Sequence, residues 1–261
     1  MTGVTEIPTV KLRGGVDMPL LGLGTWQAQG RKGYEAVRYA LEIGYRHLDT
    51  ATFYGNEAEV GRAVRDSGVP RDEVFVTTKL PPGRAGQERR TIAESLRALE
   101  MDRVDLWLIH WPPRGAAKPE TWQQLLAIRD EGLARAVGVS NYSIGQIDEV
   151  TGATGEAPAV NQIPWSPYHY DAGSLAAHRE RGIVVEGYSP FKNSDLRAPV
   201  LVEIAEAHGV TPAQVVLRWH IQHRTVVIPK SVRPERIREN LDVFGFTLSD
   251  AEISRIDSLG R

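Results

Sequence analysis

Short apolar runs alternate with longer amphipathic stretches along almost the whole chain. A rhythm of this kind favours a parallel sheet whose strands are joined by crossover helices. With 261 residues, the chain is close to the roughly 250 residues of one (β/α)8 barrel. Rhythm and length together predict a single α/β domain over residues 1–261, a (β/α)8 TIM barrel preceded by a short β-hairpin around Gly14 and Gly15.

The apolar runs give the expected strands. They are Leu20 to Leu23, Arg46 to Leu48, Val74 to Thr77, Val104 to Ile109, Ala134 to Val139, Ala159 to Gln162, Val184 to Gly187 and Val226 to Ile228. Helical patterns, such as those over residues 33–43, 58–67 and 87–99, lie between the strands. Because no linker or composition shift divides the chain, we expect the strands to close into one barrel.

Composition excludes several classes of protein. A formal net charge of -2 gives no electrostatic bias toward nucleic acid or a membrane surface. The absence of cysteine from the sequence removes disulfides, Cys-ligated zinc, iron-sulfur clusters and thiolate catalysis. The opening MTGVTEIPTV lacks the basic and apolar runs of a leader, and nowhere do about 18 apolar residues follow one another, so we expect a cytoplasmic protein.

Polar side chains stand at the ends of three consecutive predicted strands: Asp49, Lys79 and His110, with Tyr54 five residues after Asp49. In a (β/α)8 barrel, the carboxyl ends of the strands share one mouth. A nearby ammonium favours phenolate and lowers the pKa of a tyrosine, while a carboxylate keeps the lysine charged. A histidine beside them can place a substrate oxygen. The grouping therefore indicates a tyrosine proton donor with three supporting residues.

Structural explanations exist for each of these residues taken alone, since an Asp after a strand is often a helix cap and a lone His is often structural. Other catalytic motifs fail. Gly22-Leu23-Gly24 has Gln27 in place of the third glycine of a dinucleotide-binding turn, and residues 138–142, GVSNY, lack the last glycine of a nucleophile elbow. The histidines show no HExxH or similar spacing, so no metal site is predicted.

Longer motifs resemble those of a known family. Residues 44–61, GYRHLDTATFYGNEAEVG, resemble the first signature of the aldo-keto reductases, and residues 228–240, IPKSVRPERIREN, resemble their cofactor signature. Between them, in the family's order, lie VTTKL, DLWLIHWP, GVSNY, NQIPWSPYH and GYSP. The resemblance covers essentially the whole chain, and the chain resembles compact prokaryotic members of the 2,5-diketo-D-gluconate reductase type. It implies a (β/α)8 barrel whose catalytic tetrad is Asp49, Tyr54, Lys79 and His110.

The resemblance also implies an activity and a cofactor: NADPH-dependent reduction of aldehydes or ketones to alcohols, with no metal and with Tyr54 protonating the alkoxide. The residues that match the nicotinamide site are Ser140, Asn141, Gln162, Tyr188 and Ser189. Those that match the 2'-phosphate and adenine sites are Lys230, Ser231, Val232, Arg236, Glu239 and Asn240. Cations and a hydroxyl suit a phosphate dianion, which favours NADPH over NADH. Taken alone, Tyr188 could be a core aromatic and the basic residues a solvated helix start.

Substrate identity is left open. Trp26, Phe53, Leu80 and Trp111 flank the motif residues and are expected to wall an apolar cleft for a small carbonyl, an α-dicarbonyl, a keto ester or a keto sugar acid. The expected partner is this small-molecule substrate. We expect the protein to be a monomer that binds neither nucleic acid nor a membrane. Two alternatives remain: a non-catalytic NADPH-binding sensor subunit, and a barrel isomerase or aldolase with a Schiff base on Lys79. The second needs a neutral lysine, whereas Asp49 favours a charged one.

Overall fold

Parallel strands follow one another around a single sheet in sequence order in the computed structural model, which describes residues 7–192 and 194–260. Within that part of the chain this sheet has eight strands: β3 (Leu23–Gly24), β4 (His47–Asp49), β5 (Phe75–Leu80), β6 (Val104–Ile109), β7 (Ala134–Ser140), β8 (Val160–Pro164), β9 (Val184–Tyr188) and β10 (Val226–Ile228). Parallel bridges from Leu21 to Val227 and from Gly24 to Lys230 join its two edges. The predicted (β/α)8 TIM barrel is confirmed.

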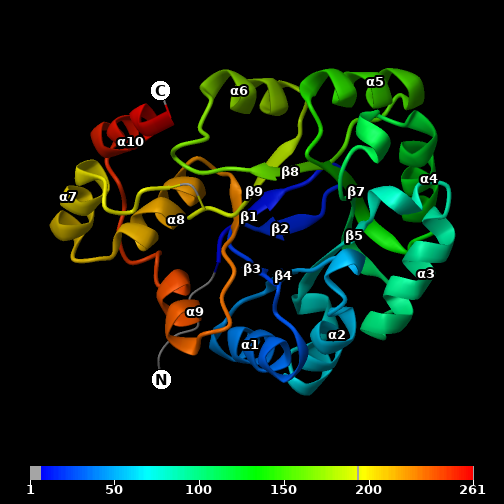
Figure 1. Ribbon diagram of the computed structural model, residues 1–261, viewed down its shortest axis with the longest axis horizontal. Coiled ribbons are helices and arrows are strands. Elements are labelled where there is room, and N and C mark those ends of the chain that lie inside the picture. The colour runs from blue at the N-terminus through cyan, green and yellow to red at the C-terminus, as the bar shows by residue number, and fades with distance from the viewer. Residues whose placement is uncertain (1–6, 193, 261) are drawn as a thin grey trace.

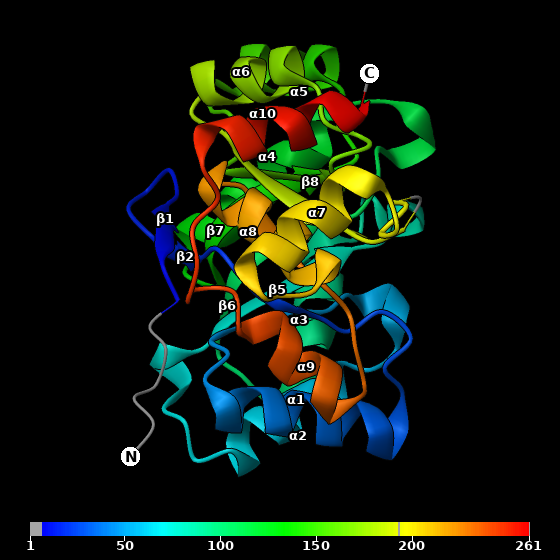
Figure 2. The ribbon, with the colours of Figure 1, turned by 90° about the vertical axis from the view of Figure 1, so that its left-hand side faces the viewer.

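The predicted N-terminal hairpin is also present. Strands β1 (Thr9–Lys11) and β2 (Asp17–Pro19) pair antiparallel. Their connection contains Gly14 and Gly15, both with φ of +85°, a conformation that glycine adopts without steric cost. Hairpin residues share a hollow with residues at the starts of β5 and β6, so the hairpin covers the barrel end opposite the carboxyl ends of the strands (Figures 1 and 2).

Helices surround the barrel on the outside (Figure 1). They are α1 (Gly30–Ile43), α2 (Glu57–Asp66), α3 (Glu88–Leu99), α4 (Pro119–Asp130), α5 (Ile144–Thr154), α6 (Ala172–Glu180), α7 (Pro199–His208), α8 (Pro212–Gln222), α9 (Pro234–Leu241) and α10 (Asp250–Asp257). Capping boxes start α5, α8 and α10, in each case a Ser or Thr followed three residues later by Gln or Glu. Among the described residues, a membrane-spanning length of apolar helix is reached only by α7 and α8 taken together, and these are bent by 89°.

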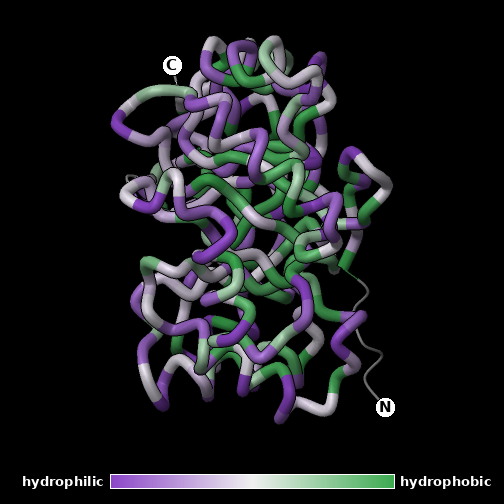
Figure 3. Tube along the Cα trace, turned by 90° about the vertical axis from the view of Figure 1, so that its right-hand side faces the viewer, coloured by the Kyte–Doolittle hydropathy of each residue, from purple (hydrophilic) through white to green (hydrophobic). Residues whose placement is uncertain are grey.

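The core lies within the barrel wall and between the wall and the helices. All six residues of β5 and all six of β6 are buried, as expected for strands covered on both faces. Hydrophobic segments concentrate in the interior of the trace in Figure 3. A second cluster, around Trp165 and Trp219, packs under α7, α8 and α10. Each fully buried large side chain contributes about 1.5–3 kcal/mol of transfer free energy.

The bounds of several strands differ from the prediction. The first barrel strand is Leu23–Gly24, and Leu21 contributes only an isolated bridge. Strand β5 continues to Leu80, and β7 to Ser140, where apolar patterning alone ended them at Thr77 and Val139. The residues beyond the predicted strand ends are polar or follow a polar residue. They still belong to the sheet because their backbone groups pair with the neighbouring strand.

Candidate active site

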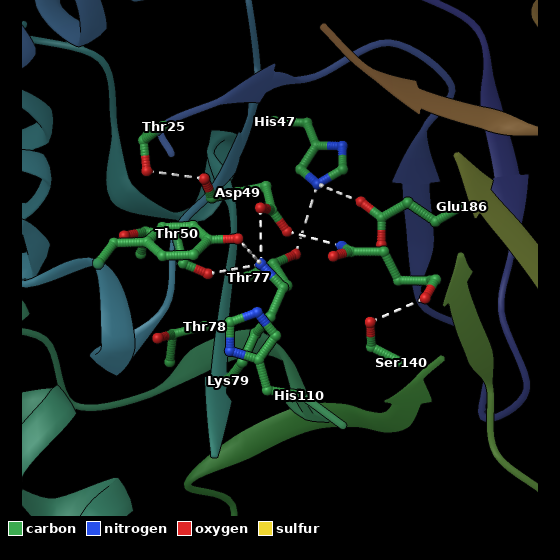
Figure 4. Close-up of polar contacts among 12 residues, drawn as sticks. Thr25, His47, Asp49, Thr50, Thr77, Thr78, Lys79, His110, Ser140 and Glu186 are labelled. Atoms are coloured by element: carbon green, nitrogen blue, oxygen red, sulfur yellow. Dashed lines mark hydrogen bonds and ion pairs between the residues drawn. The ribbon is translucent and has the colours of Figure 1, made fainter. Parts of the chain in front are cut away.

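A buried lysine lies at the centre of the polar residues at the carboxyl ends of the strands. Lys79, in β5, is fully buried, and its Nζ donates to Asp49 Oδ1 at 2.7 Å and to the Thr50 carbonyl at 2.9 Å. The same Nζ is 3.4 Å from the hydroxyl of Tyr54, which ends a 3-10 turn after β4. The ring of His110 is 5.6 Å from the ring of Tyr54. Figure 4 shows the lysine reaching toward Asp49 with His110 beside it.

The electrostatics of this group keep Lys79 charged. Burial acts to lower the pKa of Lys79, but the negative charge of Asp49, with help from Tyr54 and Glu186, leaves that pKa above its ordinary value. For Tyr54, burial is the largest influence and raises the pKa, while Lys79 acts to lower it. The expectation that the lysine gives Tyr54 a lowered pKa is therefore corrected, because burial outweighs the ammonium. The phenol carries its proton at neutral pH.

His110 is neutral in this setting. Burial, with the nearby Lys79 charge, lowers the pKa of His110 to about 2. Its ring stacks on Trp111 with centroids 3.9 Å apart. Within the described residues, His110 Nδ1 has no hydrogen-bond partner. Because His110 also lines the cleft beside Tyr54, its neutral imidazole can form a hydrogen bond to a polar group of a ligand.

The second oxygen of Asp49 is held from across the barrel. Gln162, in β8, donates from Nε2 to Asp49 Oδ2 at 2.8 Å. The Ser140 hydroxyl at the end of β7 donates to the Gln162 carbonyl at 2.8 Å. The carboxylate of Asp49 is thus fixed at both oxygens, by Lys79 and by Gln162. Gln162 and Ser140, which the sequence assigned to a nicotinamide site, therefore lie beside Asp49, the carboxylate that holds Lys79.

Strained backbone marks the ends of two strands. Asn141 follows β7 with φ of 63°, and Ser189 follows β9 with φ of 54°. Such left-handed conformations cost roughly 1–2 kcal/mol for residues other than glycine. Asn141 is held there by bonds from its Nδ2 to the His110 carbonyl at 3.1 Å and from the Tyr188 hydroxyl to its Oδ1 at 2.8 Å. Glu100, Arg114, Lys118 and Arg224 also have positive φ and do not line the cleft, so at Asn141 and Ser189 it is the position at strand ends together with these bonds that relates the conformation to the site.

Except for the fully buried Lys79, the tetrad candidates line one cleft of about 330 Å³. Its lining residues are Gly24, Trp26, Asp49, Tyr54, His110, Trp111, Ser140, Asn141, Gln162, Tyr188, Ser189, Lys192, Ile228 and Lys230. A larger hollow of about 690 Å³ lies between the Pro82–Arg84 turn and α4, and none of the four tetrad candidates lines it. In the described part of the chain, no group of His, Asp and Glu side chains is arranged to hold a metal ion.

The expected aromatic walls are arranged unequally. Trp26 and Trp111 line the cleft, and Phe53, 62% exposed, stacks on Trp26 with ring centroids 6.1 Å apart. Leu80 does not reach the cleft, because it is fully buried and belongs to the hydrophobic core. Successive side chains of a strand point to opposite faces, so the inward direction of Lys79 turns Leu80 outward. The expectation for Leu80 is corrected.

The residues expected at the phosphate and adenine end lie mostly beyond the cleft itself. Lys230 lines the cleft and is exposed, as is Arg236 at the start of α9. Ser231 is buried, and its Oγ accepts from the Arg233 amide at 3.1 Å. The remaining three members are Val232, half-buried against the core, Glu239, which accepts from Thr211 at 2.8 Å, and Asn240, buried in α9.

Sequence reasoning missed three residues of the cleft. Gly24 and Ile228 end β3 and β10, so the strand-end rule that found Asp49 could have found them. A Cβ on Gly24 would lie 2.8 Å from the Ile228 carbonyl oxygen, which requires glycine at this close approach. Lys192 comes from the loop after β9, where no strand end or motif marked it.

Comparisons with known proteins give matches along almost the whole chain. The model of the aldo/keto reductase family matches residues 20–261. The chain is 46% identical to morphine 6-dehydrogenase of Pseudomonas putida, over 97% of this chain and 91% of that protein. It is 44% identical to 2,5-diketo-D-gluconic acid reductase B of a Corynebacterium species, over 98% and 94% of the two chains.

Solved structures give the same result. An aldo/keto reductase from Brucella melitensis superposes with a TM-score of 0.93 at 40% identity, covering 97% of this chain and 100% of the other. An aldo-keto reductase of Bombyx mori, solved in complex with NADP, superposes with a TM-score of 0.90 at 32% identity, covering 98% and 93%.

Proposed function

The chain belongs to the aldo/keto reductase family of oxidoreductases, and we propose that it reduces aldehydes and ketones to alcohols with NADPH, using Tyr54 as the proton donor. The observation that carries the proposal is the position of Lys79 Nζ, fully buried between Asp49 Oδ1 at 2.7 Å and the Tyr54 hydroxyl at 3.4 Å. A buried ion pair is by itself a poor source of stability, so a catalytic role explains this charged lysine better than a structural one.

Proton donation follows from the charges around Tyr54. Because burial raises the pKa of Tyr54, the phenol is protonated when a substrate arrives. As the proton moves to the substrate oxygen, the ammonium of Lys79 stabilises the phenolate that forms. Asp49 keeps Lys79 charged and oriented, so the group needs no reorganisation during the transfer.

His110 has a different role in this proposal. Its pKa of about 2 keeps the imidazole neutral, so it orients the carbonyl oxygen by hydrogen bonding and does not compete as an acid. Its stacking on Trp111 and edge contact with Tyr54 fix the plane of the ring. A carbonyl oxygen held by both side chains would lie where Tyr54 can protonate it.

The residues of the cleft fit NADPH. When bound, NADPH supplies the hydride that adds to the carbonyl carbon. Ser140, Asn141 and Gln162 line the cleft together with the half-buried ring of Tyr188, and hydrogen bonds within the protein fix the three polar side chains in place. Exposed Lys230 and Arg236 lie toward α9, where a phosphate dianion would find two cations. The Bombyx mori relative was solved with NADP, and a further relative was solved with NADPH.

The Lys79 environment argues against the Schiff-base alternative. An amine nucleophile must lose its proton, whereas the pKa of Lys79 is raised by Asp49 and Tyr54. Similar chains are named morphine 6-dehydrogenase and 2,5-diketo-D-gluconic acid reductase B, so the relatives do not point to one substrate. Substrates proposed for this chain are small aldehydes, α-dicarbonyls, keto esters and keto sugar acids.

The test is NADPH oxidation by the purified protein with methylglyoxal, phenylglyoxal, nitrobenzaldehyde, a keto ester and diketogluconate. NADH and the Tyr54→Phe variant are the controls. Turnover that depends on Tyr54 supports the proposal. A Tyr54→Phe variant with undiminished turnover contradicts the assignment of the proton donor. Tight NADPH binding without turnover of any of these compounds would favour the non-catalytic subunit instead.

A further inference from the structure

Asn56 is placed to cap a helix and does not cap it. It is the residue before α2, and Asn is among the preferred residues there because its side chain can accept from the first free amides. The structure gives α2 no side-chain cap, and Asn56 is fully buried. Capping therefore does not account for a buried amide at this position, two residues after Tyr54.

All the polar groups of the Asn56 side chain are used to connect loops. Its Nδ2 donates to the carbonyl of Thr25 at 2.8 Å and to the carbonyl of Ala28 at 3.0 Å. Its Oδ1 accepts from the Thr50 hydroxyl at 2.7 Å. Both amide hydrogens and the amide oxygen are thus satisfied inside the protein. The side chain fastens the loop after β3 to the segment after β4.

A second amide side chain fastens the same two loops in the opposite direction. Gln29, in the loop after β3, donates from Nε2 to the Tyr54 carbonyl at 2.6 Å. The hydroxyl of Thr25 donates to the Asp49 carbonyl at 2.9 Å (Figure 4). The loop after β3 includes Gln27, whose φ of 59° is strained for a side chain with a Cβ and must be held by such contacts.

The two fastened segments carry the residues that act at the cleft. Trp26 lies in the first loop, and its ring contacts the Tyr54 ring edge-on with centroids 5.0 Å apart. Thr50, which donates to Asn56, offers its carbonyl to Lys79 Nζ at 2.9 Å. Asn56 itself does not line the cleft. Its partner Thr50 contacts Lys79, its partner Thr25 precedes Trp26, and Tyr54 lies two residues before Asn56.

We propose that Asn56 is a positioning residue that sets the Tyr54 hydroxyl against Lys79 and holds Trp26 over the cleft. This rests on the proposed function, because the role of Asn56 is exerted through Tyr54. If the two loops separate, the Tyr54 hydroxyl moves relative to the substrate oxygen, and misplacement by about 1 Å can cost on the order of a hundredfold in rate. Nucleotide binding is unaffected, since Asn56 contacts none of the residues assigned to it.

The sharpest variant is Asn56→Asp. It keeps an oxygen for the Thr50 hydroxyl and replaces the two donors by an oxygen that faces the carbonyls of Thr25 and Ala28. Gln222→Glu is the control for an amide-to-carboxylate change away from the cleft, at a half-buried side chain whose oxygen also accepts from Arg218 at 3.0 Å. Gln222, on α8, also spans a loop with its amide, donating to the Leu248 carbonyl at 2.9 Å and accepting from the Leu248 amide at 2.8 Å, and it does not line the cleft.

The experiment is a double-mutant cycle with Tyr54→Phe, measured in single turnovers with NADPH and a reducible aldehyde. We expect Asn56→Asp to lower the rate about tenfold to a hundredfold with unchanged NADPH affinity, while Gln222→Glu stays near the parent rate. In the Tyr54→Phe background, Asn56→Asp should cost little more, because residues that act as one unit are not additive.

Two results overturn the role of Asn56. One is a parent-like rate for Asn56→Asp, and the other is an equal rate loss with and without Tyr54, which would mark a general structural effect. Both leave the proposed function intact if Tyr54→Phe alone abolishes most of the turnover. Undiminished turnover in Tyr54→Phe alone overturns the proposed function, and with it the route through Tyr54.

Discussion

His47 and Glu186 face each other inside the barrel, with His47 Nε2 3.6 Å from Glu186 Oε1 and both side chains fully buried. They come from β4 and β9, which are not neighbours in the sheet, and Figure 4 shows the contact beside the Asp49 network. Both carboxylate oxygens of Glu186 lack a hydrogen-bond partner in the described part of the chain. Lys79 already serves Asp49, so an ionised Glu186 would be a second buried anion without its own cation.

The first prediction concerns Glu186 and alkaline pH. Burial, reinforced by Asp49, raises the pKa of Glu186 above its ordinary value. A carboxyl whose pKa is higher in the folded protein than in the unfolded chain stabilises the fold fully at pH values below its unfolded-state pKa. This contribution is lost in the window between the two values, as the pH rises through the folded-state pKa. Glu186→Gln should therefore gain on the parent as pH rises, by up to about 1.4 kcal/mol per pH unit in that window. Urea unfolding at a series of pH values measures this, and a constant difference would contradict it.

The second prediction concerns His47 and acid. Burial lowers the pKa of His47 from 6.5 to about 3, so the folded protein resists a proton that the unfolded chain accepts. The stabilising contribution is present above pH 6.5 and is lost as the pH falls toward 3. His47→Gln should flatten the acid limb of the stability profile in that window. An acid limb as steep as that of the parent, followed by urea unfolding, would exclude this source.

The third prediction concerns the stability cost of removing one charge or both charges of the Asp49–Lys79 pair. Lys79→Met removes the only ammonium that Asp49 contacts in the described residues and leaves a buried carboxylate. Breaking a buried pair costs about 3–5 kcal/mol, whereas removing both charges costs much less. The double variant Asp49→Asn with Lys79→Met should therefore be more stable than Lys79→Met alone. Thermal or urea unfolding decides the order, and the reverse order would show that Asp49 is not held as an anion.

The fourth prediction concerns cofactor preference. Arg236→Ala should weaken NADPH about tenfold or more, because hydrogen bonds to charged groups contribute about 1.5–3 kcal/mol each. NADH affinity should change little, since NADH lacks the phosphate. Arg238→Ala on the same helix is the control, because Arg238 instead donates to the Tyr39 hydroxyl at 3.0 Å. Fluorescence titration with both nucleotides measures the affinities, and equal weakening of the two would remove the phosphate role from Arg236.

The barrel could be predicted from the sequence because its information is local. Apolar runs buried on both faces indicate the strands, and the positions of Asp49, Lys79 and His110 at strand ends are enough to place them at one mouth. Leu80 was also predictable in principle, since alternation turns it away from the side on which Lys79 points. Proximity to a motif residue along the chain is therefore a weaker guide to a cleft than the alternation of the strand.

What the sequence could not supply depends on the assembled interior. The direction of the Tyr54 pKa shift depends on whether burial, which raises it, outweighs the Lys79 charge, which lowers it. How deeply Tyr54 is buried depends on the folded structure, in which Trp26 packs beside its ring. The three bonds of Asn56 join segments that are separate in the chain, and neither its residue type nor its position after Tyr54 identifies the partners of those bonds. Lys192 reaches the cleft only through the course of one loop.

The left-handed backbone at Asn141 and Ser189 divides the cleft into a part that can evolve and a part that cannot. Residues other than Gly, Asn and Asp adopt that backbone at a cost of roughly 1–2 kcal/mol, so few residue types are open to these two positions. Lys230 and Arg236 have no such constraint, being exposed with φ outside the left-handed region. Engineering of nucleotide choice should therefore diversify the α9 side and leave the two strand ends as a fixed template.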